Sequence, residues 1–282
     1  MKVIIVGAKG MLGTAVAERF STQHETFAYG HEQLDIADFG AVRGAIEGLK
    51  PDWVINCAAI TNVDNCEHDP LRAYRVNALG PWNLAAACEG ARARLVHLST
   101  DYVFDGTKAE PYIESDRTNP INAYGRSKLE GELRVRAVTC QCYIVRTAWL
   151  FGPREENFLP WVLDVGTKQS PVYLVDDQWG SPTYVADVAE GIAWLLEQAP
   201  LYGVYHLVNR GSCTRRQLGE VALRAAGIET PVEGIPMSAL PRPARRPVHT
   251  PLRNWMLEVR GGWNAPPYQD AVERFMKAWL SR

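Results

Sequence analysis

Short apolar runs alternate with longer segments of helical period through the first half of the chain. Several runs are rich in β-branched residues and apolar throughout, as expected of strands that helices cover on both faces. Strands are predicted at residues 3–6, 26–29, 53–57, 95–98 and 142–146. Between the second and third runs, apolar residues recur at Phe39, Val42, Ile46 and Leu49, which form one helical stripe. This alternation predicts an α/β fold with a Rossmann-type doubly wound parallel sheet.

The pattern changes after about Phe151, where the first predicted domain, residues 1–150, ends. Prolines are dense in residues 231–251, and proline lacks the amide donor that a helix interior or a central strand needs. We expect an irregular segment there, packed over a site or a surface. Residues 269–280 have helical spacing and predict a docked terminal helix. Residues 151–282 are therefore expected to form mainly a smaller second domain, with some segments returning to the first.

The composition is typical of a soluble globular protein. The chain has 282 residues, of which 46% are hydrophobic and 22% are charged. A formal net charge of -2 gives no electrostatic reason to expect a nucleic-acid or membrane partner. The N-terminal apolar run is too short for an export signal, and the six cysteines include no C-x-x-C pair. We therefore expect a cytoplasmic protein whose cysteines are free thiols, rather than a disulfide framework.

A glycine loop, Gly7-Ala8-Lys9-Gly10-Met11-Leu12-Gly13, follows the first predicted strand and opens a helical segment. Strand, glycine turn and helix N-terminus together make an anion site, because amides point outward and the helix dipole favours negative charge. Glycine also lets a diphosphate approach the backbone closely. The spacing is G-x-x-G-x-x-G, not the G-x-G-x-x-G of many dehydrogenases. The loop predicts dinucleotide binding, with a plain structural turn as the alternative.

The residues after the second predicted strand bear on the choice of nicotinamide cofactor. An acid at the end of that strand would accept the ribose 2′-hydroxyl of NAD. Here the strand ends in Tyr29-Gly30-His31, and Glu32 follows one position late. Lys9 in the glycine loop is placed to pair with a 2′-phosphate, although it can also be a solvated lysine. The sequence favours NADPH, with NADH as the alternative.

Tyr124 and Lys128 are four residues apart in a predicted helical segment, which places them one turn apart on one face. A phenol has a pKa of about 10, and a nearby ammonium favours the phenolate and lowers that pKa toward neutrality. Y-x-x-x-K also occurs by chance on solvated helices. The pair gains weight from Ser99-Thr100-Asp101-Tyr102 directly after a buried strand, because ligands bind at the carboxyl ends of strands in such sheets.

These motifs together resemble the extended short-chain dehydrogenase/reductases, and within that superfamily the dTDP-4-dehydrorhamnose reductases. The resemblance runs nearly end to end. Besides the glycine loop, it rests on Asn56-Cys57-Ala58-Ala59, Ser99-Thr100-Asp101-Tyr102-Val103-Phe104-Asp105-Gly106, Tyr124-Gly125-Arg126-Ser127-Lys128, Arg146-Thr147-Ala148-Trp149 and Asp177-Gln178-Trp179-Gly180-Ser181-Pro182-Thr183. It implies a Rossmann domain that binds NADP(H), a smaller domain that binds a dTDP-sugar, and reduction of a C4 keto group.

The resemblance also implies roles for individual residues. Tyr124 would donate a proton to the C4 carbonyl oxygen, Lys128 would hold the nicotinamide ribose and lower the Tyr124 pKa, and Thr100 would hydrogen-bond the same oxygen. Cofactor contacts are implied for Tyr124 and Lys128 and for Gly7, Lys9, Gly10, Met11, Leu12, Gly13, Asp35, Ile36, Asn56, Ala58, Ala59 and Ser99. Substrate contacts are implied for Thr100, Asp101, Tyr102, Trp149, Asn157, Phe158 and Arg246.

Several of these roles have structural alternatives. Asp101 can be a turn cap, and Asn56 can serve only backbone groups. Arg242 and Arg245 compete with Arg246 for the diphosphate of the substrate, whose oxygens suit a planar guanidinium fork. The sequence does not choose among the three arginines.

The sequence also bears on metal binding, on oligomeric state and on alternative functions. Some members of the family form dimers with Mg²⁺ held partly by an acid on the helix after the glycine loop; here the first acid is Glu18, so we expect no metal. A homodimer stays an open option. A dehydratase would carry T-D-E where this chain has Tyr102, which disfavours elimination chemistry. A reductase of another dTDP-4-keto-6-deoxy-sugar and a non-catalytic NADP-binding regulatory subunit remain the alternatives.

Overall fold

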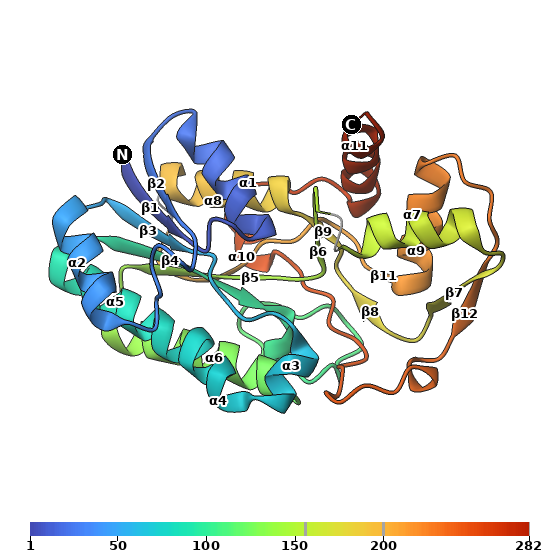
Figure 1. The fold of residues 1–282 in the computed structure, drawn as a ribbon, viewed down its shortest axis with the longest axis horizontal. Helices are drawn as coiled ribbons and strands as arrows, with labels where there is room; N and C mark the ends of the chain where they lie inside the picture. Colours follow the sequence, from blue (N-terminus) through green and yellow to red (C-terminus); the bar gives the residue numbers. More distant parts are fainter. Residues whose placement is uncertain (155–156, 199–200, 282) are drawn as a thin grey trace.

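The computed structural model describes residues 1–154, 157–198 and 201–281. Its centre is a six-stranded sheet with the order β10-β5-β4-β3-β1-β2, in which every neighbouring pair is parallel (Figure 1). Its strands are β1 (Lys2–Val6), β2 (Glu25–Tyr29), β3 (Trp53–Asn56), β4 (Arg94–Thr100), β5 (Cys142–Thr147) and β10 (Gly203–His206). The expected doubly wound α/β fold is confirmed. Strand β4 extends beyond the predicted Leu98, so Thr100 is its last residue.

Helices cover both faces of this sheet. On one face, α1 (Met11–Ser21) and α8 (Val185–Gln198) share a core with side chains such as Ile5 and Ile55, and α10 (Trp255–Val259) adds Leu257. On the other face, α2 (Phe39–Leu49), α5 (Gly80–Ala91) and α6 (Ala123–Val138) pack on residues such as Ile4 and Val54. The predicted stripe contributes only Val42 and Ile46 as fully buried residues of α2. Burial on both faces explains why the strands lack alternation.

A smaller layer of helices and short strands lies beside the sheet, at the right of Figure 1. Here α7 (Phe158–Lys168), α9 (Arg215–Ala225) and α11 (Tyr268–Leu280) pack around one apolar core, and α11 confirms the predicted terminal helix. The short strands pair as β7 (Val172–Val175) with β12 (Val232–Ile235), β8 (Trp179–Gly180) with β11 (Cys213–Thr214), and β6 (Leu150–Phe151) with β9 (Thr183–Tyr184).

The proline-dense segment is irregular except at its start, where our expectation was wrong. Strand β12 forms there because Pro231 and Pro236 flank it without interrupting it, and it pairs only with β7. A 3-10 turn, η3 (Met237–Ala239), follows. Beyond it the chain runs back toward the sheet, and isolated bridges join His249 to Trp179 and Leu252 to Tyr112.

Short helical pieces complete the fold between the large elements. They are α3 (Val63–His68), α4 (Pro70–Tyr74), the π turn η1 (Arg75–Leu79) and the 3-10 turn η2 (Asp101–Val103). The division near residue 150 stays a prediction; α8 and β10, which come after it, add a helix and a strand to the large sheet. All six cysteines are free. Among the described residues, no helix is both long and apolar enough to cross a membrane.

Candidate active site

The glycine loop connects β1 to α1 through contacts that allow no side chain. Gly7 has a φ of 74°, and an added Cβ would lie 2.5 Å from the amide nitrogen of Ala58. A Cβ on Gly13 would lie 2.2 Å from the carbonyl oxygen of Gly7. The Ala8 amide donates a 3.0 Å hydrogen bond to the Tyr29 carbonyl, which fixes the loop against β2. Only glycine lets loop, helix and strand approach this closely.

The first turn of α1 has no side chain that accepts its free amides. Gly10 is the N-cap and makes no side-chain cap, and no acid follows in the first turn. By contrast, Asp38, Asn122 and Asn157 cap α2, α6 and α7 with side-chain oxygens. The α1 terminus therefore offers amides and dipole to an external anion. These residues fit the diphosphate of a dinucleotide.

A groove of about 540 Å³ begins at this loop. Among the predicted cofactor residues, it is lined by Gly7, Lys9, Gly10, Asp35, Ile36, Ala58 and Ala59. The structure adds residues that the sequence did not single out for cofactor binding, namely His31, Leu34, Ala37, Ile60, Arg72, Arg75 and Val76. Arg72 and Arg75 come from α4 and the π turn, where no recognisable motif marks them.

The remaining predicted cofactor residues lie behind the groove lining. Leu12 is buried in the core between α1 and the sheet. The Asn56 side chain bonds the His97 ring nitrogen at 3.0 Å and accepts the Ala58 amide at 3.0 Å. The Met11 sulfur accepts a 3.1 Å bond from Asn157. Asn56 thus holds Ala58 in the lining, and direct contacts of these side chains with a cofactor stay predictions.

Lys9 forms an ion pair with Glu32, with 2.8 Å between Nζ and the carboxylate oxygen. Both side chains are exposed, at 67% and 81%. The hydrogen bond from Lys9 lowers the pKa of Glu32. The lysine proposed to read a 2′-phosphate therefore lines the groove but is paired with Glu32, the first acid after β2. An exposed pair of this kind is weak enough for a phosphate to replace.

Thr100, Tyr102 and Tyr124 meet where β4 ends and α6 begins. Asn122 caps α6 by accepting the Gly125 amide at 2.8 Å. A Cβ on Gly125 would lie 2.1 Å from the Tyr102 carbonyl, so this glycine lets α6 approach the turn after β4. As a result Tyr124 hydrogen-bonds Thr100, and its ring centroid lies 5.8 Å from that of Tyr102.

Burial raises the pKa of Tyr124 above its ordinary value, and the hydrogen bond with Thr100 only partly opposes this shift. Our expectation of a lowered pKa was wrong for the cofactor-free chain, because loss of solvation outweighs the favourable contacts. The raised pKa suits a proton donor, since the Tyr124 phenol stays protonated at neutral pH.

Lys128 is buried one turn further along α6. Its Nζ donates a 2.6 Å hydrogen bond to the Leu98 carbonyl at the end of β4. Burial lowers the pKa of this ammonium to about 8, and Glu132 acts in the opposite direction. Glu132 is itself held by Arg146 through bonds of 2.9 and 2.7 Å and by Ser99. Ser99 is therefore part of this buried network and is not among the residues that line the groove.

Asp101 is buried behind Thr100. Its carboxylate accepts hydrogen bonds from Thr250 at 2.6 Å and from Thr100 at 3.0 Å. Burial raises its pKa to about 6. Asp101 therefore orients the Thr100 hydroxyl and fastens the proline-dense segment at Thr250; a direct substrate contact stays a prediction.

A pocket of about 560 Å³ lies next to the Tyr102 side chain. Four predicted substrate residues line it: Tyr102, Asn157, Phe158 and Arg246. The other lining residues are Trp161, Tyr173, Leu174, Val175, Gln178, Arg215, Met237, Leu240 and Arg242. The structure thus gathers segments that are distant in sequence, from η2, α7, β7, α9 and the proline-dense stretch.

Trp149, also a predicted substrate residue, is not among the residues that line this pocket. Its φ of 41° is unusual for a residue other than glycine. Its indole packs on Gly180, where a Cβ would come within 2.2 Å of the ring. The Arg215 guanidinium lies 3.5 Å from the centre of the Trp149 ring. Trp149 therefore acts on the pocket through Arg215, whose only signal in the sequence is an arginine pair at a helix start.

The three arginines of the proline-dense segment differ in their surroundings. Arg246 forms a two-pronged ion pair with Asp64, with both distances 2.8 Å, and this lowers the Asp64 pKa. Arg242 lines the pocket and is exposed. Arg245 is exposed outside the pocket lining, although its carbonyl accepts a bond from Asn122.

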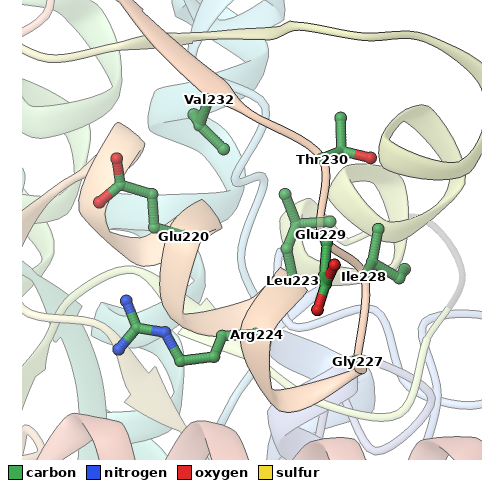
Figure 2. A pocket seen from close by; sticks show the side chains of 8 residues that line it. All are labelled: Glu220, Leu223, Arg224, Gly227, Ile228, Glu229, Thr230 and Val232. Atoms are coloured by element: carbon green, nitrogen blue, oxygen red, sulfur yellow. The ribbon is translucent and has the colours of Figure 1, made fainter.

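A separate pocket of about 360 Å³ lies between the end of α9 and the segment that leads into β12 (Figure 2). Glu220 and Arg224 project from the helix, and Thr230 and Val232 come from the segment opposite. None of the predicted catalytic residues lines it. Within the described ranges, no three His, Cys, Asp or Glu side chains gather in a way that would hold a metal ion.

The family model described as "RmlD substrate binding domain" matches residues 1–281. The chain belongs to the RmlD family. It is 36% identical to a dTDP-4-dehydrorhamnose reductase of Burkholderia thailandensis, over 100% of both chains. It is also 36% identical to a probable dTDP-4,6-dihydroxy-2-methyloxan-3-one 4-ketoreductase of Streptomyces antibioticus, covering 92% of this chain and 94% of the other.

A solved structure gives the same relationship in three dimensions. The chain is similar to the dTDP-4-dehydrorhamnose reductase of Bacillus anthracis in complex with NADP, with a TM-score of 0.95 and 35% identity. The match covers 99% of this chain and 100% of that one. The resemblance to the extended short-chain dehydrogenase/reductases is thereby confirmed at the level of fold and family.

Proposed function

We propose that this RmlD-family protein is a reductase that converts the C4 keto group of dTDP-4-dehydrorhamnose to the hydroxyl group of dTDP-L-rhamnose, with NADPH as reductant. The observation that carries the proposal is the hydrogen-bonded pair of Thr100 and Tyr124, with Lys128 one turn away. This pair stands at the carboxyl end of β4, where ligands bind in parallel sheets. Tyr102 extends the same cluster into the pocket.

The roles of the side chains follow from their protonation states and contacts. When bound, the reduced nicotinamide supplies the hydride that reaches the C4 carbon. The Tyr124 phenol, kept protonated by burial, donates its proton to the C4 oxygen, so the carbonyl becomes a hydroxyl. The Thr100 hydroxyl donates its one proton to Asp101 in the cofactor-free chain, and it would turn that proton to the C4 oxygen as negative charge develops there. The Lys128 ammonium holds the nicotinamide ribose and stabilises the phenolate that remains.

The groove residues support a dinucleotide, and the relative from Bacillus anthracis contains NADP. We assign the diphosphate to the uncapped start of α1 and the adenosine to the groove between Asp35-Ile36 and Ala58-Ala59. Lys9 is proposed to exchange Glu32 for a 2′-phosphate, which would favour NADPH over NADH. In this scheme the sheet domain of residues 1–150 holds the cofactor, and residues 151–282 hold most of the dTDP-sugar.

Reduction is favoured over elimination by the environment of Tyr102. A dehydratase needs a base at this place to remove a proton from carbon. Burial raises the pKa of Tyr102, and the neighbouring Asp101 raises it further, so the phenol is no base at neutral pH. The cluster therefore provides one proton donor and no partner for elimination.

Reduction of another dTDP-4-keto-6-deoxy-sugar is the second candidate, because the Streptomyces antibioticus relative carries the name of a different ketoreductase at the same identity. Purified protein should be mixed with NADPH and enzymatically prepared dTDP-4-keto sugars, with the loss of NADPH absorbance followed and the product identified by NMR. Formation of dTDP-L-rhamnose supports the first proposal, and another C4 epimer or sugar supports the second. Binding of NADPH without turnover on any such sugar would instead indicate a non-catalytic NADP-binding subunit.

A further inference from the structure

Arg215 packs against two aromatic rings near Asp101 and Tyr102. It is the first residue of α9 and is half-buried. Its guanidinium carbon lies 3.5 Å from the centre of the Trp149 ring and 5.0 Å from that of Phe158. Stacking of this kind fixes the plane of the guanidinium and reduces the entropy lost when its fork binds a ligand. The side chain is therefore already ordered where it lines the pocket.

The positive charge of Arg215 has no adjacent counter-charge. Among the described residues, no carboxylate forms an ion pair with its guanidinium. The next residue in the chain, Arg216, pairs with both Asp176 and Glu220. Asp101 acts on Arg215 at longer range, but its oxygens already accept bonds from two threonines.

The position of Arg215 on α9 also opposes local stability. The N-terminal turn of a helix carries partial positive charge, so a cation there is repelled by the dipole. No acid in the first turn of α9 offsets this repulsion. Stacking on the two rings favours this position, but no ion pair offsets the repulsion by the dipole, and a ligand with negative charge would supply the missing partner.

The pocket that Arg215 lines has the charge of an anion site. Three arginines line it, and no Asp or Glu is among the described residues that line it. Arg246 is neutralised by Asp64, whereas Arg242 approaches from the proline-dense segment and repels Arg215. An anion between Arg215 and Arg242 would turn this repulsion into attraction for both.

We infer that Arg215, stacked on Trp149 and assisted by Arg242, binds the diphosphate of the nucleotide substrate. The inference rests on the proposed function for the nature of the nucleotide, and it identifies which arginine meets the phosphates. A guanidinium can bind two phosphate oxygens at once, which the ammonium of a lysine cannot. Arg246, in contrast, holds the proline-dense segment against α3 through Asp64.

The test compares ligands that differ only in the diphosphate. Binding of dTDP and of thymidine is measured by titration calorimetry in saturating NADP⁺, which keeps the diphosphate out of the cofactor groove. Arg215→Gln should weaken dTDP about 10- to 100-fold, because a charged hydrogen-bonding partner is lost. Thymidine should bind equally to both proteins. Unchanged NADP⁺ affinity and melting temperature verify that the variant is folded.

Two further variants sharpen the result. Arg216→Gln changes the neighbouring arginine, which is paired with acids away from the pocket, and should leave dTDP affinity unchanged. Arg215→Lys keeps the charge but loses the fork and much of the stacking, so it should give an intermediate affinity. It also replaces the glutamine variant if that protein does not fold.

Unchanged dTDP affinity in Arg215→Gln, or an equal loss for dTDP and thymidine, would overturn the assignment. Failure of the proposed function looks different: wild-type protein would bind UDP or GDP in place of dTDP. The same variants titrated with that diphosphate and its nucleoside then decide the role of Arg215 independently. If wild-type protein binds none of the three diphosphates, the diphosphate site is refuted together with the dTDP-sugar.

Discussion

The cofactor groove and the substrate pocket are built in different ways. Groove residues come from the first third of the chain, and the glycine loop at its centre works through backbone amides. An added carbon at Gly7 or Gly13 would overlap backbone atoms. Pocket residues come from five separate segments and act through side chains, among them three arginines and several aromatic rings.

The difference fits the ligand that we propose for each region. A dinucleotide is a constant ligand, so a rigid backbone surface with little freedom to vary can bind it. A sugar substrate differs among related reductases, and side chains on separate segments can change without disturbing the sheet. Relatives that share the family but carry different sugar names agree with this division. The proposed catalytic cluster lies where the two regions meet, and the following experiments separate their contributions.

The largest effect is expected at that meeting point. Tyr124→Phe removes the proton donor and keeps the ring, so turnover should fall about 10²- to 10⁴-fold while NADPH affinity is unchanged. Turnover is followed by NADPH absorbance and affinity by NADPH fluorescence. Turnover close to that of the wild type would refute the role assigned to Tyr124.

On the groove side, Gly13→Ala should abolish measurable NADPH binding and lower stability. The new Cβ would lie 2.2 Å from the Gly7 carbonyl, and relieving the overlap costs about 1–3 kcal/mol. Gly44→Ala is the matched control, because nothing lies within 4 Å of a Cβ there and the helix should gain about 0.5–1 kcal/mol. Thermal melts and NADPH titration measure both; tight NADPH binding by Gly13→Ala contradicts the groove assignment.

The pH dependence tests Lys128. Burial depresses its pKa to about 8, so the ammonium is present below that pH and is lost as the pH rises through it. The kcat/KM value, which reflects the free enzyme, should fall about tenfold per pH unit above about 8. Lys128→Arg stays charged, so any residual activity should lack this alkaline limb. A limb that persists in this variant would assign the pKa to another group.

On the pocket side, Gly180→Ala should disturb the substrate and spare the cofactor. Its Cβ would meet the Trp149 ring at 2.2 Å and displace the surface on which Arg215 stacks. We expect KM for the dTDP-sugar to rise roughly tenfold, while the Kd of NADPH changes less than about twofold. A parallel loss of NADPH affinity would show that groove and pocket are not separable.

The smallest effect is expected at Lys9. Both members of the Lys9–Glu32 pair are exposed, so Lys9→Ala should weaken NADPH only about two- to fivefold. NADH affinity should stay the same, because NADH lacks the 2′-phosphate. Equal losses for NADPH and NADH would mean that Lys9 does not read the phosphate.

Much of the sheet domain was predictable from sequence because its signals are local. Buried parallel strands have continuous apolar runs, and the helix stripe of α2 lies within eleven residues. The errors of prediction also came from local signals. Strand β12 was not predicted because the prolines that flank it suggested an irregular chain, although neither proline lies in the strand. The sign of the Tyr124 pKa shift was mispredicted because spacing reveals a neighbouring ammonium but not the loss of solvent.

The sequence by itself determined the fold class, the glycine loop and the spacing of Tyr124 and Lys128, since each depends on contiguous residues or on spacing within one helix. Thr100 joins Tyr124 only because α6 packs closely on the turn after β4. Only the tertiary structure showed that Arg246 is paired with an acid and that Arg215 lines the same pocket stacked on an aromatic ring. Arg246 meets Asp64 across 182 positions, and Arg215 meets Trp149 from another part of the chain. Such pairings depend on how separate elements pack together, so no local pattern records them.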